Sequence, residues 1–163
     1  MSATAPFVIS RALDAPRARV WQAWTDVEHL KHWWGPKGFV VRHCTLDLRP
    51  GGKMHYCLRS PDGSDMWGRF VYREIVKPER LVWVNSFSDE KGGITKHPMM
   101  DDWPSEMLTT VTFAEQGKGT LVTVSWHPIN ASEDERRVFE QGRASMQQGW
   151  TGTFEQLALY LAL

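Results

Sequence analysis

The sequence predicts an α+β fold in which a curved antiparallel sheet of about seven strands wraps around one long C-terminal helix. Strand-like segments follow one another between residues 39 and 127, and turns rich in glycine and proline separate them. After residue 132, apolar side chains recur three, four or seven positions apart, which is the period of a helix. An antiparallel sheet has one face to bury, and this helix is the predicted element long enough to cover it.

The first strand is expected over residues 7–13, and two short helices follow it. The first helix covers residues 17–24. Thr25 and Glu28 have the spacing of a capping box, which predicts that a second helix begins at Thr25 and runs to residue 31 or 32. Gly35 and Pro36 then end any helix. The two helices form a small helical corner beside the sheet.

The remaining strands are expected as a meander of neighbours. They cover residues 39–48, 53–60, 66–76, 81–88, 107–114 and 120–127. Residues 89–105 interrupt this series with a long irregular insertion that contains His97 and Trp103. Long insertions in small domains are often lids or binding loops. This segment is therefore a candidate part of a binding site.

The C-terminal helix is expected to run without a break from Ser132 to residue 161. Ser132 and Glu135 form a capping box, and the acidic first turn matches the positive end of the helix dipole. The face toward the sheet mixes Met146 and Trp150 with the small Gly149 and Thr153. Such a face either fills a core or leaves a cavity.

Size and charge indicate one domain over residues 1–163, with a flexible N-terminus at residues 1–5. The 19 basic and 19 acidic side chains cancel, so the net charge attracts neither nucleic acid nor an anionic membrane. No secretory signal and no apolar run of ~20 residues is visible. We expect a cytoplasmic protein that binds neither nucleic acid nor membrane.

The two cysteines are expected to stay reduced. Keeping the apolar positions on one face pairs Leu48 with Met54, Leu46 with Tyr56 and Cys44 with Leu58. Cys57 then points to the opposite face, so no disulfide forms, which agrees with a cytosolic compartment. A bulge in the turn would shift this pairing by one residue.

Several short segments together resemble the START-like (SRPBCC) superfamily. They are residues 15–16, 20–26, 33–36, 48–52, 74–75, 78–81 and 149–150, and the match runs from about Phe7 to Leu161. More narrowly, they are similar to the branch that groups the C-terminal domain of the heat-shock-90 ATPase activator with the calicheamicin-resistance protein. The resemblance implies a helix-grip fold with a cavity between the sheet and the C-terminal helix.

The same resemblance implies three functions among which fold alone does not choose. The first is a protein that binds a small apolar or aromatic ligand, which is our leading hypothesis. The second is a regulatory module for the chaperone ATPase, which the absence of the activator's additional N-terminal domain weighs against. The third is an enzyme with Glu74, Tyr72 or His97 as acid or base. Association into a homodimer is also open.

Register arguments select the side chains that face the helix. They pair Phe70 with Phe87, Tyr72 with Asn85 and Glu74 with Trp83, and across the last hairpin Met107 with Trp126 and Thr109 with Val124. The candidate ligand-binding residues are Tyr56, Phe70, Tyr72, Glu74, Trp83, Asn85, Phe87, Trp103, Met107, Trp126, Met146 and Trp150.

Two alternatives stand beside this pocket. The aromatic and Met side chains could instead be plain core, and Glu74 could lie at the rim of the sheet, where solvent removes the cost of burying a carboxylate. The six histidines lack the spacing of a zinc motif, and no motif for a nucleophile is present. We therefore expect no metal, no cofactor and no catalytic residues, and a binding protein rather than an enzyme.

Overall fold

The computed structural model describes residues 5–97 and 100–163, so most of the N-terminal segment expected to be flexible lies outside the described residues. The strands are β1 (Phe7–Leu13), β2 (Val40–Leu46), β3 (Lys53–Arg59), β4 (Asp65–Val76), β5 (Arg80–Ser88), β6 (Ile94–Thr95), β7 (Met107–Gln116) and β8 (Gly119–Pro128). The helices are α1 (Arg17–Thr25), α2 (Val27–Trp33), α3 (Glu133–Gln141) and α4 (Arg143–Leu161).

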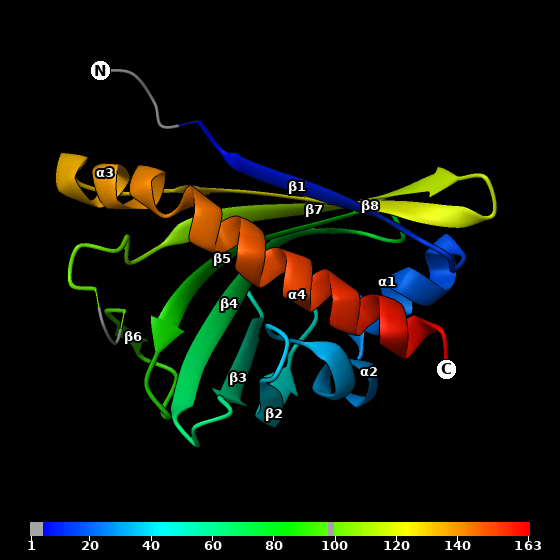
Figure 1. Cartoon of the computed structure of the whole chain (residues 1–163), viewed down its shortest axis with the longest axis horizontal. Helices are drawn as coiled ribbons and strands as arrows, with labels where there is room; N and C mark the ends of the chain where they lie inside the picture. The colour runs from blue at the N-terminus through cyan, green and yellow to red at the C-terminus, as the bar shows by residue number, and fades with distance from the viewer. Residues whose placement is uncertain (1–4, 98–99) are drawn as a thin grey trace.

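The strands form one antiparallel sheet, and the long C-terminal helix lies across one of its faces (Figure 1). The strand order is β1-β8-β7-β5-β4-β3-β2, and β6 pairs with β5 off this path. The helical corner α1–α2 covers the same side of the sheet near the end of α4 (Figure 1). The predicted α+β helix-grip architecture is confirmed. The strand β6, inside the insertion, was not predicted.

Two hairpins pair with a register two residues away from the predicted one. Leu46 lies opposite Met54 and Cys44 opposite Tyr56, because residues 47–52 form a longer turn than expected. In the last hairpin Thr109 lies opposite Trp126, and Met107 opposite Pro128. A shift of two residues leaves every side chain on its predicted face, because side chains alternate with period two.

The cysteines are both free, as the facing argument predicted. Cys44 shares a face with Tyr56, whereas Cys57 lies opposite His43 on the neighbouring strand. Burial raises the pKa of the Cys44 thiol to about 11. The thiol is therefore protonated and unreactive at neutral pH.

A bulge at Arg73 corrects the predicted pairing of β4 with β5. Tyr72 lies opposite Trp83, and Glu74 lies opposite Val82 rather than Trp83. The extra residue turns Glu74 to the face away from α4. Its carboxylate is half-exposed and lies 3.6 Å from the guanidinium of Arg80. The rim alternative for Glu74 is therefore the correct one. Further along the hairpin, Phe70 lies opposite Asn85 and Gly68 opposite Phe87.

The long C-terminal helix is interrupted at Gly142, whereas one unbroken helix was predicted. A Cβ at this position would lie 2.9 Å from Cζ3 of Trp103, so the glycine makes room for that indole ring. The capping box of Ser132 and Glu135 is present as predicted. At α2, Asp26 and not Thr25 caps the helix, and its carboxylate accepts the Glu28 N–H at 2.9 Å.

One half of the space between sheet and helix is filled by aromatic rings. Trp24 of α1 lies within 6.5 Å of five other rings, measured between centroids, and reaches both the sheet and α4. Phe70 and Trp83 stack with centroids 4.3 Å apart. Trp33 donates its indole N–H to the carbonyl of Ala23 at 3.0 Å. The helical corner thus closes this half of the sheet.

Candidate ligand-binding cavity

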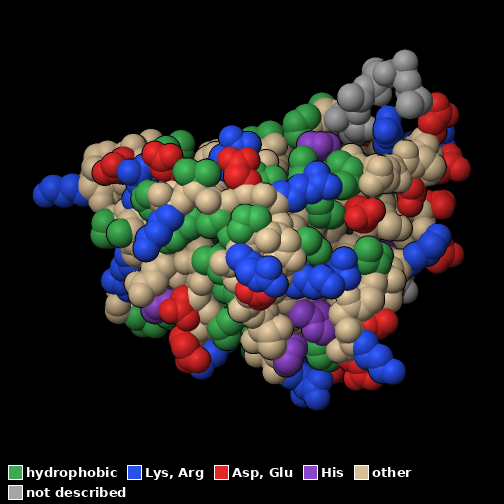
Figure 2. Space-filling view, turned by 180° about the vertical axis from the view of Figure 1, so that it is seen from behind, with side chains coloured by type: hydrophobic (Ala, Val, Ile, Leu, Met, Phe, Trp, Pro, Cys, Tyr) green, Lys and Arg blue, Asp and Glu red, His purple; other side chains and the backbone are tan. Residues whose placement is uncertain are grey.

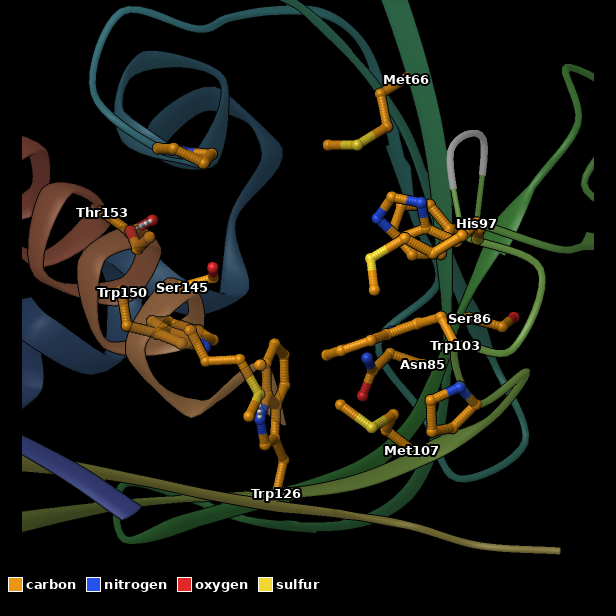
Figure 3. A pocket seen from close by; sticks show the side chains of 18 of the residues that line it. Met66, Asn85, Ser86, His97, Trp103, Met107, Trp126, Ser145, Trp150 and Thr153 are labelled. Carbon is orange, nitrogen blue, oxygen red and sulfur yellow. Dashed lines mark hydrogen bonds between the residues drawn. The ribbon is translucent and has the colours of Figure 1, made fainter. Parts of the chain in front are cut away.

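The other half of the space between sheet and helix holds a cavity of about 500 Å³ (Figure 3). It lies between the inner face of β3, β4, β5, β7 and β8, the insertion after β5, and the helices α3 and α4. The lining residues are Trp34, Gly35, Pro36, Tyr56, Leu58, Met66, Asn85, Ser86, Phe87, His97, Met100, Trp103, Pro104, Met107, Trp126, Val138, Gln141, Gly142, Ser145, Met146, Gly149, Trp150 and Thr153.

The helix wall is built by Met146, Gly149, Trp150 and Thr153, which succeed one another at helical spacing on α4. The indole of Trp150 lies edge-on to that of Trp126 from β8, with centroids 5.6 Å apart. Trp126 donates its N–H to the sulfur of Met146 at 3.0 Å. These contacts fix the rings of this wall and leave open space beside Gly149, where an added Cβ would meet nothing within 4 Å.

The insertion forms the wall that faces α4 (Figure 3). Trp103 packs against Phe139 of α3, with centroids 6.1 Å apart, and against Gly142. His97 lies edge-on to Phe87 of β5 at 4.8 Å. Partial burial lowers the pKa of His97, so the ring is neutral at pH 7. The insertion therefore closes one side of the cavity.

Few polar groups reach this cavity. Asn85 projects from β5 into it (Figure 3), and Oδ1 of its amide accepts the Thr109 hydroxyl at 2.5 Å. Tyr56 lies over Gly68, and burial raises the pKa of its hydroxyl far above the usual value. The buried indole N–H of Trp34, which also borders the cavity, meets no acceptor with hydrogen-bond geometry among the described residues.

Eight of the twelve predicted residues line the cavity: Tyr56, Asn85, Phe87, Trp103, Met107, Trp126, Met146 and Trp150. The other four do not, which corrects the prediction. Phe70, Tyr72 and Trp83 belong to the packed half and are almost fully buried there. Glu74 faces away because of the bulge at Arg73. Among the three groups considered as acid or base, His97 lines the cavity and Tyr72 and Glu74 do not.

The remaining lining residues were not among the twelve candidate ligand-binding residues. Gly142, Gly149 and Thr153 could have been included, because each lies three or four positions from Met146 or Trp150. Ser145 directly precedes Met146 and has no such spacing. Trp34 packs in the helical corner and also borders the cavity. Residues of the insertion, such as Met100, follow no periodic pattern that predicts their contacts.

Among residues 5–97 and 100–163, no group of three or more His, Cys, Asp or Glu side chains could hold a metal ion. Within the same ranges no helix is long and apolar enough to cross a membrane. On the sheet face seen from behind, basic and acidic side chains are interspersed (Figure 2). An example is Asp65, which pairs with both Arg42 and Arg59.

Comparison with known proteins identifies the family. The family described as Activator of Hsp90 ATPase homolog 1-like protein matches residues 14–162, which is nearly the whole chain. The chain belongs to this family. The resemblance inferred from short segments is thereby confirmed, and the family and fold support a ligand-binding or regulatory domain in general. A comparison with curated proteins gave no match.

Solved structures of bacterial proteins share the fold of this Activator of Hsp90 ATPase homolog 1-like chain. A protein from Nitrosomonas europaea is 25% identical, with a TM-score of 0.77 over 99% of this chain and 97% of that chain. A protein from Arthrobacter aurescens is 27% identical, with a TM-score of 0.76 over 98% and 87%. One from Mycobacterium smegmatis is 26% identical, with a TM-score of 0.75 over 96% and 90%.

Proposed function

We propose that this chain is a small-molecule-binding domain that holds an apolar, aromatic ligand between the sheet and α4. The observation that supports the proposal is the cavity of about 500 Å³ beside a half that is packed with buried aromatic side chains. Ligand pockets in proteins usually measure about 300–1,000 Å³ and have apolar walls with few polar groups. This role agrees with the ligand-binding or regulatory domain that the family and fold support in general.

The walls favour an aromatic ligand in particular. Trp103, Trp126 and Trp150 present ring faces and edges from three different elements. Aromatic pairs gain about 0.5–1.5 kcal/mol beyond the burial of their area. Met107 and Met146 add flexible, polarisable side chains that adapt to the outline of a ring system.

Binding of N-phenylnaphthylamine, an uncharged fluorophore that brightens in apolar sites, tests the proposal. The matched variants are Gly149→Leu and Gly149→Ala. Because an added Cβ at Gly149 meets open space, both variants should fold. The leucine side chain fills part of the cavity, whereas the alanine methyl leaves most of it open.

We expect saturable binding to the wild-type chain and to Gly149→Ala, and binding at least about tenfold weaker for Gly149→Leu. Equal binding by all three chains would place the probe outside the cavity and contradict the proposal. Absence of binding to the wild-type chain would contradict it as well. Thermal unfolding of each variant shows that it is folded.

A further inference from the structure

The described lining of the cavity is uncharged, since none of these residues is Asp, Glu, Lys or Arg. The titratable groups on its walls are held neutral, because burial raises the pKa of Tyr56 and lowers that of His97. A charged ligand would therefore leave water without gaining a partner of opposite charge, which is costly. The walls favour an uncharged ligand.

One polar side chain on the sheet wall, that of Asn85, is held in place by a hydrogen bond that uses only part of its hydrogen-bonding capacity. Thr109, which is fully buried on β7, donates its hydroxyl to Oδ1 of Asn85 at 2.5 Å. This bond fixes the orientation of the amide. The Nδ2 group of Asn85, with two N–H donors, has no hydrogen-bond partner among the described residues, and the amide points into the cavity (Figure 3).

Two other donors around the cavity are already used. Thr153 donates its hydroxyl to the carbonyl of Gly149 at 3.0 Å, and Trp126 donates its N–H to the sulfur of Met146 at 3.0 Å. The amide of Asn85 is therefore a fixed donor that remains available opposite the aromatic wall of α4. A donor of this kind selects a ligand with a hydrogen-bond acceptor, because an unpaired amide in an apolar site is costly.

We infer that this cavity takes an uncharged aromatic ligand that carries an acceptor oxygen, such as a carbonyl, and that the Asn85 amide donates to that oxygen. The inference rests on the proposed function, since it specifies the ligand class for the same cavity. Thr109 acts as a positioning residue, because it holds the amide through Oδ1 and leaves Nδ2 toward the ligand.

Charge selectivity is tested with two probes that share one ring system. N-phenylnaphthylamine is uncharged, and anilinonaphthalene sulfonate carries a sulfonate. We expect the uncharged probe to bind the wild-type chain at least about tenfold more tightly. Ser145→Arg, which puts a cation on the exposed part of the α4 wall, should reduce that ratio by strengthening binding of the sulfonate. Equal affinity of the two probes in the wild-type chain would overturn the inference but leave the proposed function standing.

The donor role of Asn85 is tested with propionyl-dimethylaminonaphthalene, an uncharged fluorophore whose emission shifts to the red when its carbonyl oxygen accepts a hydrogen bond. Asn85→Ala removes the amide donor, and Asn85→Leu replaces it with an apolar side chain of similar size. Both variants should shift the bound emission to the blue and weaken binding about two- to tenfold.

The control for this experiment is N-phenylnaphthylamine, which lacks a carbonyl and should bind Asn85→Leu as tightly as it binds the wild-type chain. Unchanged emission and affinity of the carbonyl probe in both Asn85 variants would overturn the assignment of the donor. A failure of both fluorophores to bind the wild-type chain would contradict the proposed function itself.

Discussion

The two halves of the space between the sheet and α4 are lined by similar residues, but one half is packed and the other holds a cavity. Around Trp24, the rings of Trp33, Trp83 and Phe113 lie at centroid distances of 4.8–6.3 Å and are packed against it. Around Trp126, equally large rings border an open volume of about 500 Å³. Residue type therefore does not decide whether such a face becomes core or pocket.

The difference arises from what covers each half. Two tryptophans of the helical corner, Trp24 and Trp34, reach inward and contact Trp150 from one side. On the other side the cover comes from the insertion, whose Trp103 rests on Gly142 at the helix break rather than deep between the layers. Trp150 lies at the border between the two halves. The packed half stabilises the fold and gives the hollow half rigid walls.

The largest effect is expected from Trp24→Ala, which removes the ring at the centre of the packed half. Large aromatic-to-alanine changes in a core cost about 3–5 kcal/mol. Trp103→Ala in the hollow half should cost less than half as much, because this side chain is only half-buried and borders open space. Urea denaturation measures both free energies of unfolding. Equal losses would show that the two halves do not differ in packing.

A second effect is expected at alkaline pH from Tyr72 in the packed half. Burial raises the pKa of its hydroxyl, so the folded state favours the neutral form. The stability that this group contributes is full below pH ~10 and falls above it, by up to about 1.4 kcal/mol per pH unit. Tyr72→Phe should therefore lose less stability than the wild-type chain between pH 9 and pH 11, which denaturation at each pH measures. The cysteines titrate equally in both chains, so an identical slope would contradict this.

A smaller effect in the opposite direction is expected from Gly149→Ala in the hollow half. The added methyl meets open space, and alanine favours a helix over glycine by about 0.8–1 kcal/mol. The variant should be more stable than the wild-type chain by about that amount in thermal or urea unfolding. Gly142→Ala is the matched control, because its Cβ would crowd Trp103 and cancel the gain. A destabilised Gly149→Ala would mean that the space is filled.

The smallest effect is expected from His97 at the cavity wall. Its pKa is lowered by partial burial, so the neutral ring contributes to the closed wall above pH ~6.5, and that contribution is lost as pH falls through the lowered pKa. Binding of N-phenylnaphthylamine should weaken about two- to threefold between pH 7.5 and pH 5. His97→Gln should remove this dependence. The same decline in the variant would assign it to another group.

Much of the fold was predictable, because alternation along a regular strand decides on which face of the sheet each side chain lies. Met107, Trp126 and Asn85 face α4 as predicted, although their partners differ by two residues. The bulge at Arg73 could not be predicted from alternation, and it misplaced Glu74.

The sequence pattern also could not predict where the packed core ends and the cavity begins. Phe70, Tyr72 and Trp83 have the same inward facing as the cavity residues, yet they are packed because Trp24 and Trp34 come from a distant helical corner to fill that half. Such contacts depend on tertiary packing and not on local periodicity. The break at Gly142 has the same origin, because it accommodates Trp103 from the insertion.

The most direct test of a hollow half that binds aromatic ligands is a crystal structure of the protein with bromonaphthalene, located by the anomalous scattering of bromine. We predict one dominant bromine site between Trp103, Trp126 and Trp150, with the surrounding rings close to the positions described above. A bromine located only on the outer face of the sheet, or an empty cavity at saturating probe, would contradict the central claim.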